Sequence, residues 1–187
     1  SISARRDITD LLHSGLAPKG SEIPFEFRLQ VWEMLAALID DPDPSTEGDF
    51  EGSGRRFYEQ AINTTRGRAV EAVIYYGVWI HRHSEHDDPN ATTFFTDDAP
   101  ELREALVRHL DSEVDSSLAV RSVYGVYLPT LHGLDARWVR DNLEKLFPTD
   151  KAKDGLRRAT WEGYVCYGKL YLSMLDLLRD EYARSVE

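Results

Sequence analysis

Apolar residues recur with the spacing of an α-helix along most of this chain, and this period constrains the fold more than any other feature. Residues 24–40 fill one stripe of a helix with Val31, Trp32, Leu35, Leu38 and Ile39. Residues 117–131 fill another with Val120, Val123, Tyr124, Tyr127, Leu128 and Leu131. Such spacing places the apolar side chains on one face of a helix. The run VEAVIYYGVWI has strand-like composition, but it is longer than a typical strand and has helical flanks. The sequence therefore predicts an all-α chain.

Polar segments and proline residues divide the predicted helices. Residues 41–54 and 82–98 are rich in Gly, Pro, Ser and acidic residues, and they are expected to be exposed loops. Pro129 must end or kink a helix because it lacks a backbone donor. The last helix is expected to run from about residue 156 to 183. Several helices are preceded by side chains suited to N-caps, namely Asn63 or Thr64, Asp98, Ser116 or Ser117, and Asp135.

Three predicted helices share a pattern of a polar cap, an arginine, and then small and apolar residues. They read NTTRGRAVEAVIYYGVW, SSLAVRSVYGVYLPTL and KDGLRRATWEGYVCYG, with Arg66, Arg121 and Arg157 or Arg158 as their arginines. Without the polar insert at 82–98, their spacing approaches the period of about 40 residues of HEAT-like hairpins. We therefore expect residues 1–187 to form one domain, an array of HEAT- or armadillo-like helical hairpins.

Packing gives a physical reason for this pattern. A helix that meets its neighbour closely requires small residues at the contact, and the expected ones are Ala69, Ala72, Gly77, Gly125 and Gly163. The arginine in the first turn is expected to pair with an acid or a carbonyl group of the adjacent repeat. The repeated arginines are therefore predicted to tie neighbouring helical units together.

The same stretches carry a resemblance to a known group of proteins. INTTRGRAVEAVIYYGVW, DSSLAVRSVYGVYLPTL with LDARWVRDNLEKLFP, and ATWEGYV resemble the C-terminal helical region of very large bacterial multidomain proteins, across roughly residues 55–180. Some of those proteins carry an upstream NTPase or SIR2-like module and are associated with anti-phage defence. The resemblance implies that this chain is a fragment of a longer protein. It also places catalysis in domains outside the chain, which contains neither GxxxxGK[ST] nor GxGxxG.

The net charge and the cysteine content indicate which partners the chain can bind and in which cellular compartment it functions. The net charge of −11 repels phosphate backbones, which argues against nucleic-acid binding. No apolar run approaches the roughly 18 to 20 residues that a membrane-spanning helix needs. The single Cys166 fits a reducing compartment, so we expect a cytoplasmic protein. Because Cys166 lies among aromatic residues, it is expected to be a buried, inert thiol.

The stretch HRHSEHDD at 81–88 is the strongest sequence signal for metal chemistry. His81, His83, His86 and Asp87 give the alternative hypothesis of a metal-dependent hydrolase. However, His81 and His83 are two residues apart and point to different sides of a helix, and no HExxH motif is present. Histidines near a helix C-terminus also have an ordinary stabilising role. We therefore expect a solvated helix end, with no metal and no other cofactor.

Clustered acidic residues are a second chemical candidate. They comprise Asp40 and Asp41, Asp97 and Asp98, and Asp111, Glu113 and Asp115. A catalytic carboxylate pair needs two acids that face each other across a cleft. Since these acids follow one another in predicted loops, we expect solvated loop acids or N-caps.

The remaining hypothesis is a non-enzymatic module that binds a protein partner or other domains of a parent chain. Concave surfaces of helical arrays bind extended partners. The residues expected at that surface are Arg66, Glu71, Tyr75, Arg121 and Tyr124. The insert at 82–98 is expected to be a contact loop. The aromatic residues Tyr124, Tyr127, Trp138, Trp161, Tyr164, Tyr167 and Tyr171 are expected to belong to the core, with a binding groove as the alternative.

Overall fold

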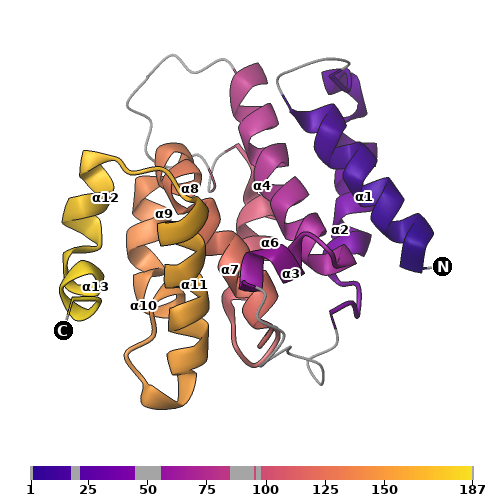
Figure 1. Ribbon diagram of the computed structural model, residues 1–187. Helices are drawn as coiled ribbons and strands as arrows, with labels where there is room; N and C mark the ends of the chain where they lie inside the picture. Colours follow the sequence, from indigo (N-terminus) through magenta and orange to yellow (C-terminus); the bar gives the residue numbers. More distant parts are fainter. Residues whose placement is uncertain (1, 18–21, 45–55, 85–94, 96–97, 187) are drawn as a thin grey trace.

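The computed structural model describes residues 2–17, 22–44, 56–84, 95 and 98–186 (Figure 1). All regular secondary structure within these residues is helical, which confirms the predicted all-α fold. The α-helices are α1 (Ile2–Leu16), α2 (Arg28–Ile39), α3 (Phe57–Ala61), α4 (Thr65–His83), α6 (Pro100–Leu110), α7 (Leu118–Val126), α8 (Leu128–Leu134), α9 (Ala136–Asp141), α10 (Leu143–Leu146), α11 (Asp154–Tyr167), α12 (Leu172–Leu177) and α13 (Arg179–Arg184). Short 3₁₀ turns at Phe25–Phe27 and Lys151–Lys153 precede α2 and α11.

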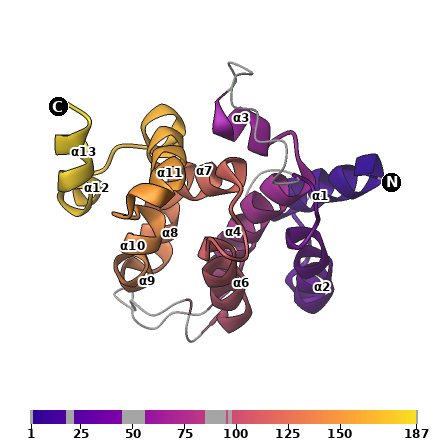
Figure 2. The same ribbon diagram turned by 90° about the horizontal axis from the view of Figure 1, so that it is seen from below.

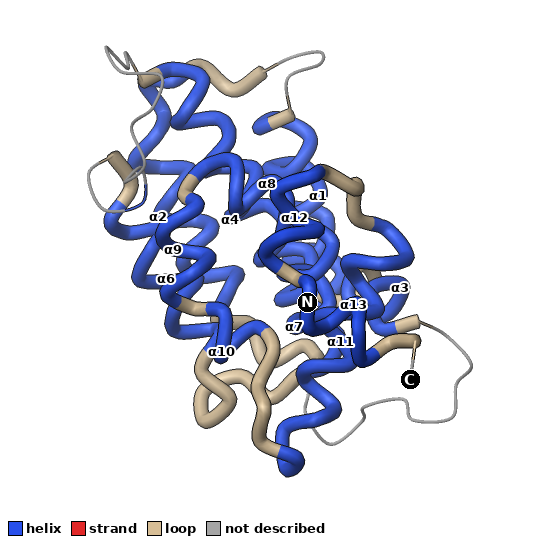
Figure 3. The backbone as a smooth tube through the Cα atoms, turned by 90° about the vertical axis from the view of Figure 1, so that its left-hand side faces the viewer, coloured by secondary structure: helices blue, strands red, loops and turns tan. Residues whose placement is uncertain are grey.

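The chain advances from one end of the molecule to the other as its sequence proceeds. Helices α1 and α2 pack on α4, α7 packs next to α4, and α11 packs on α7. The sequence-ordered colours of Figures 1 and 2 therefore run across the molecule from α1 to α12 and α13. Figure 3 shows the same helices as a tube with short connections between most of them. None of the described helices is long and apolar enough to cross a membrane.

Helix α4 forms the centre of the core because nearly all of its faces meet another helix. Its buried side chains include Tyr76, Trp79 and Ile80. Helix α1, which is not among the helices expected from the sequence, covers α4 with the buried side chains of Leu12 and Leu16. The remainder of α1 is largely polar or exposed, so its apolar stripe is too narrow to stand out in the sequence.

Helices α7 and α11 approach each other closely at two glycines. A Cβ atom on Gly125 would lie 1.9 Å from the carbonyl oxygen of Thr160, and one on Gly163 would lie 2.2 Å from that of Ser122. Real Cβ atoms do not approach backbone oxygens so closely, and only glycine fits at either position. The predicted helix contact at these residues is confirmed.

Capping side chains and a proline in the sequence correctly predicted several helix ends. The side chains of Thr64, Ser117 and Asp135 accept hydrogen bonds from backbone N–H groups in the first turns of α4, α7 and α9. Helix α7 ends before Pro129, which lies in the first turn of α8. The prediction of Asp98 as an N-cap is wrong, because Ala99 occupies that position before α6.

The single C-terminal helix expected over residues 156–183 is wrong. Helix α11 ends at Tyr167, and Gly168 adopts an extended conformation with ψ at 168° while its N–H donates to the Tyr164 carbonyl. The chain then resumes as α12 and α13. This break separates Tyr167 from Lys169 and lets both contribute to the cleft described below.

The two predicted loops are described only at their edges. Residues 45–54 of the first, and 85–94 with 96–97 of the second, lie outside the described residues. Contrary to the expectation of wholly exposed loops, Asp41 and Pro44 are buried at the edge of the first. In the second, Phe95 is fully buried against Trp138, with ring centroids 5.3 Å apart.

Candidate functional site

The residues predicted to form a binding surface divide into an internal group and a group at a cleft. Arg121 and Tyr124 are 1% and 0% exposed, so neither is available to a partner, and the expectation of a surface position is wrong for both. Arg66 is half-buried and occupied by contacts within the chain. Glu71 is buried and Tyr75 half-buried, and both belong to the surroundings of one cleft.

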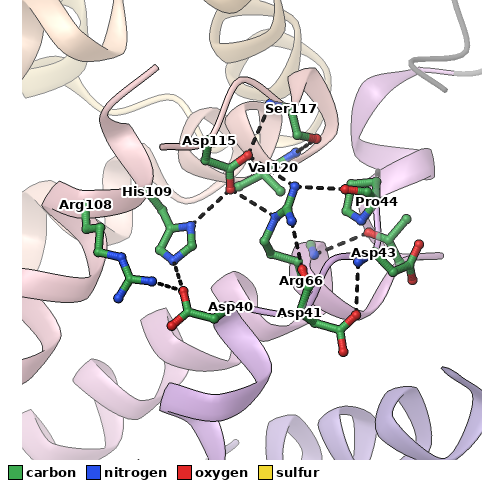
Figure 4. Close-up of polar contacts among 12 residues, drawn as sticks. Asp40, Asp41, Asp43, Pro44, Arg66, Arg108, His109, Asp115, Ser117 and Val120 are labelled. Carbon is green, nitrogen blue, oxygen red and sulfur yellow. Dashed lines mark hydrogen bonds and ion pairs between the residues drawn. The ribbon is translucent and has the colours of Figure 1, made fainter. Parts of the chain in front are cut away.

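Arg66 fixes the segment that follows α2 against the segment that precedes α7 (Figure 4). Its guanidinium donates to the carbonyl oxygens of Asp41 at 2.8 Å and Pro44 at 2.9 Å. Its Nε atom lies 3.1 Å from Oδ2 of Asp115. Three acceptors from two distant segments therefore hold the guanidinium in place, and its role is structural.

Asp115 is the centre of this polar network, which we call the Asp115 cluster and which comprises Asp40, Arg66, Arg108, His109 and Asp115. Besides Arg66, its carboxylate lies 3.0 Å from Nδ1 of His109 and accepts the N–H of Ser117 at 3.1 Å. Nε2 of His109 lies 3.3 Å from Oδ1 of Asp40, on the other side of the ring. The expectation that Asp115 is a solvated loop acid is wrong, because its side chain is buried among these donors.

Asp40 forms the outer end of the cluster and is more exposed. The hydrogen bond from Arg108 lowers the pKa of the Asp40 carboxyl, since it stabilises the charged form, and this effect outweighs partial burial. The neighbouring Asp41 does not belong to the cluster through its side chain, which instead pairs with Arg5 at 2.5 Å. Both acids therefore have structural partners, contrary to the expectation of solvated loop acids.

The repeated arginines fill equivalent structural roles. Arg121 donates to the carbonyl oxygens of Leu110 at 2.8 Å and Lys145 at 2.5 Å, near the ends of α6 and α10. Arg157 lies 2.8 Å from Oε2 of Glu181 on α13. The predicted pairing of these arginines with acids or carbonyl groups is confirmed. Arg121 in addition satisfies carbonyls near two helix ends, where the last carbonyls lack an intrahelical partner.

The histidine-rich stretch lies at the end of α4. His83 packs its ring parallel to Phe25 with centroids 4.9 Å apart, and its Nδ1 lies 2.9 Å from the Trp79 carbonyl oxygen. His81 is exposed in the same turn. His86 and Asp87 lie outside the described residues. In the part of the chain that the structure describes, no three His, Cys, Asp or Glu side chains are placed to hold a metal ion.

A cleft of about 420 Å³ lies where α3, α4, α8 and the segment after α11 meet, and we call it the tyrosine cleft. It is lined by Tyr58, Tyr75, Val126, Tyr127, Pro129, Thr130, Tyr167, Lys169 and Tyr171. Tyr167 and Tyr171 are 37% and 51% exposed, whereas Tyr58, Tyr75 and Tyr127 are half-buried. The cleft therefore offers aromatic surface that the core does not cover.

The rings of the cleft form two contact groups, which we together call the row. Tyr167 packs on Tyr58 with centroids 4.9 Å apart, and Tyr127 packs edge-to-face on Tyr75 at 5.7 Å. Tyr75 in turn packs on His13 of α1 at 4.4 Å. Each pair lies in the range of favourable aromatic contacts, so packing within the row restrains the rings.

Glu71 joins the two halves of the row from beneath. Its Oε1 atom accepts hydrogen bonds from the hydroxyl groups of Tyr58, at 3.0 Å, and Tyr127. Its Oε2 atom lies 2.5 Å from Arg68, and Nε2 of His13 lies 3.6 Å from Oε1. One buried carboxylate therefore fixes the orientation of two tyrosines in the cleft.

The surroundings of Glu71 keep it ionised. Burial alone would raise the pKa of its carboxyl, but the adjacent His13, the hydrogen bond from Tyr127 and the charge of Arg68 outweigh it and lower the pKa to about 2. Burial and the negative charge of Glu71 raise the pKa of Tyr58 to about 12, and the same two causes raise the pKa of Tyr127. The phenols therefore remain protonated donors at neutral pH.

The pKa of Glu71 makes stability depend on pH in a defined window. Because folding lowers this pKa from 4.5 to about 2, the stabilisation is complete above about pH 5 and is lost as the pH falls toward 2. We expect the free energy of unfolding of the wild type to fall, relative to that of Glu71→Gln, by about 3 kcal/mol between about pH 6 and pH 2. Urea unfolding of both proteins across this range measures the difference. A difference that stays constant with pH would contradict the assigned role.

Part of this site is predictable from the sequence. Glu71 and Tyr75 were predicted for a binding surface, and Tyr127, Tyr167 and Tyr171 for the core with a groove as the alternative. Tyr58 carries no periodic signal, because α3 is only five residues long. The break after α11 also contributes, because in one continuous helix Tyr167 and Lys169, two residues apart, would point to different sides.

Cys166 also differs from its expected position. The thiol is exposed rather than buried. The buried face of α11 comprises Leu156, Ala159, Thr160, Gly163 and Tyr164. Cys166 lies in the last turn of α11, beyond these residues, and its aromatic sequence neighbours do not enclose it.

Comparisons of the chain with protein-family models, with curated proteins and with solved structures found no match.

Proposed function

We propose that this chain is a non-enzymatic protein-interaction module that binds an extended segment of a partner protein, or of another domain of a longer parent chain, in the tyrosine cleft. The observation that carries the proposal is the row of partly exposed tyrosines held in place by the buried Glu71. Tyrosine is enriched among residues that dominate binding energy at protein interfaces. Prior fixation of the rings reduces the entropy lost on binding.

The arrangement of the helices supports a HEAT-like array as the scaffold for this module. The three helices that carry the repeated arginines, α4, α7 and α11, pack in succession along the molecule. Each of their arginines contacts a segment outside its own helix. Stacked helical units of this kind present extended binding surfaces in other proteins.

The sequence resemblance supports a place for the module in a larger protein. The stretches that carry it coincide with α4, with α7 to α10, and with residues 159–165 of α11. We therefore propose a cytoplasmic module of a large bacterial multidomain protein. Catalytic activity, such as that of an NTPase or SIR2-like module in anti-phage defence, would belong to other domains of that protein.

Selection of random peptides displayed on phage tests the proposed function. We expect the wild-type chain to enrich peptides that Thr130→Trp does not bind, because the added indole would fill the cleft that Thr130 lines. Arg137→Trp is the matched control, since Arg137 does not line the cleft and its side chain is 72% exposed on α9. It should bind the enriched peptides as tightly as the wild type.

Two results would contradict the proposal. One is the absence of enriched peptides whose binding depends on Thr130. The other is equal binding by the wild type and Thr130→Trp, which would place the interaction elsewhere on the surface. Thermal melts followed by far-UV circular dichroism should show that both tryptophan variants remain folded.

A further inference from the structure

We propose that the tyrosine cleft selects an arginine side chain of the segment it binds. This inference rests on the proposed function and adds the chemistry of the ligand. A cation near the face of an aromatic ring is attracted by the negative charge on that face. A guanidinium group adds planar stacking and several N–H donors, which an ammonium group does not supply in the same geometry.

Hydrogen bonds to carboxylates make the rings of this cleft better partners for a cation. The hydroxyl groups of Tyr58 and Tyr127 donate to Glu71, and that of Tyr167 donates to Glu59 at 2.9 Å. A phenol that donates its hydrogen to an anion is polarised, and its ring becomes more negative. At least three of the tyrosines that line the cleft are polarised in this direction.

The chain itself already places a guanidinium against one of these rings. The Cζ atom of Arg56 lies 5.9 Å from the centroid of Tyr167, within the range of a cation–π contact. The carboxylate of Glu59, which accepts from the same tyrosine, stands at this outer end of the row as an acceptor for guanidinium N–H groups. The net charge of −11 draws basic segments toward the surface.

The fixed charges beside the cleft determine how the proposal is tested. Arg68 balances Glu71 beneath the rings, so attraction arises from the polarised ring faces and not from an unpaired carboxylate. Lys169 is the one charged side chain among the described residues that line the cleft. It repels a cationic ligand and attracts an anionic one. The sign of its effect on affinity therefore separates the two classes of ligand.

Nuclear magnetic resonance titration with small probes measures this selectivity directly. The probes are N-acetyl-arginine methylamide, the neutral N-acetyl-citrulline methylamide of nearly the same shape, and the anionic N-acetyl-glutamate methylamide. We expect the arginine probe to shift the ring resonances of Tyr58, Tyr75 and Tyr127, and to bind about tenfold more tightly than the citrulline probe. Lys169→Gln, a change at an exposed position, should raise the affinity for arginine about two- to threefold.

Other outcomes would overturn the inference and leave the proposed function to its own test. Equal affinity for the arginine and citrulline probes would show that the positive charge of the guanidinium does not contribute to binding. Tighter binding of the glutamate probe, or weaker arginine binding by Lys169→Gln, would assign the cleft to an anionic ligand. Absence of binding by all three probes would also exclude selection of arginine. Peptides that depend on Thr130 in the phage selection would still show a binding cleft in each case.

Discussion

Asp115→Ala is expected to lower the free energy of unfolding by about 3–5 kcal/mol. Asp115 lies between Arg66 and His109, with its side chain only 2% exposed. Removal of the carboxylate leaves Arg66, whose side chain is 12% exposed, without its ion-pair partner and removes the acceptor of the Ser117 N–H. The loss of one member of a buried ionic network costs more than the net contribution of the pair, because the remaining charge stays desolvated. Urea unfolding at neutral pH followed by circular dichroism measures the loss.

Two further variants show whether charge or packing causes this loss. Asp115→Asn keeps the size and one acceptor oxygen but removes the charge, and it should fall between the wild type and Asp115→Ala. Asp141→Ala removes an exposed carboxylate, 3.8 Å from Arg137, and should cost less than about 1 kcal/mol. A loss of similar size for Asp115→Ala and Asp141→Ala would show that the Asp115 cluster does not stabilise the fold.

Gly125→Ala is expected to destabilise the protein by about 3 kcal/mol or more, near the upper end of overpacking effects. Its Cβ atom would lie 1.9 Å from the Thr160 carbonyl oxygen and 2.9 Å from the Tyr164 backbone nitrogen. Both atoms belong to the backbone of α11, so no side-chain rotation relieves the clash, and the helices must separate. Because α7 leads to Tyr127 and α11 ends at Tyr167, separation should also disturb the tyrosine cleft.

Gly133→Ala is the matched control for this change. Gly133 is also in a helix, α8, but a Cβ atom there meets nothing within 4 Å. Since alanine is the better helix former, this variant should equal the wild type or gain up to about 1 kcal/mol. Both variants can be compared by thermal and urea unfolding. Equal stability of Gly125→Ala and the wild type would contradict the close contact between α7 and α11.

Changes at Asp115 and Gly125 are also expected to affect the tyrosine cleft, because its residues come from several different helices. Glu71 and Tyr75 come from α4, Tyr58 from α3, and Tyr127 from the junction of α7 and α8. Contacts of α7 with α4, α3 and α11 bring these elements together. A variant that loosens α7 is therefore expected to reduce peptide binding, whereas one that fills the cleft at Thr130 blocks binding without unfolding the chain.

Features that depend on neighbours along the chain are predictable from the amino-acid sequence. Apolar periodicity predicts the all-α fold because a helix repeats its faces every few residues. Thr64, Ser117 and Asp135 were identifiable as N-caps because each side chain bonds a backbone group three residues away. The close helix contact at Gly125 and Gly163 was also predictable, because a residue without a side chain lets two helices approach. The pairing of the repeated arginines was predictable because a guanidinium in the first turn of a packed helix needs an acceptor from another segment.

Long-range helix packing sets which of these residues are buried, exposed or assembled into a site. Asp115 is buried and is not a solvated acid, because Arg66 and His109 from other elements contact its carboxylate. Cys166 is exposed because the buried face of α11 ends before it. In the tyrosine cleft, Tyr58 packs against Tyr167, which lies far away in the chain. Such a pairing leaves no periodic pattern in the sequence. Contacts of this range arise from how helices pack, which a pattern along the chain does not encode.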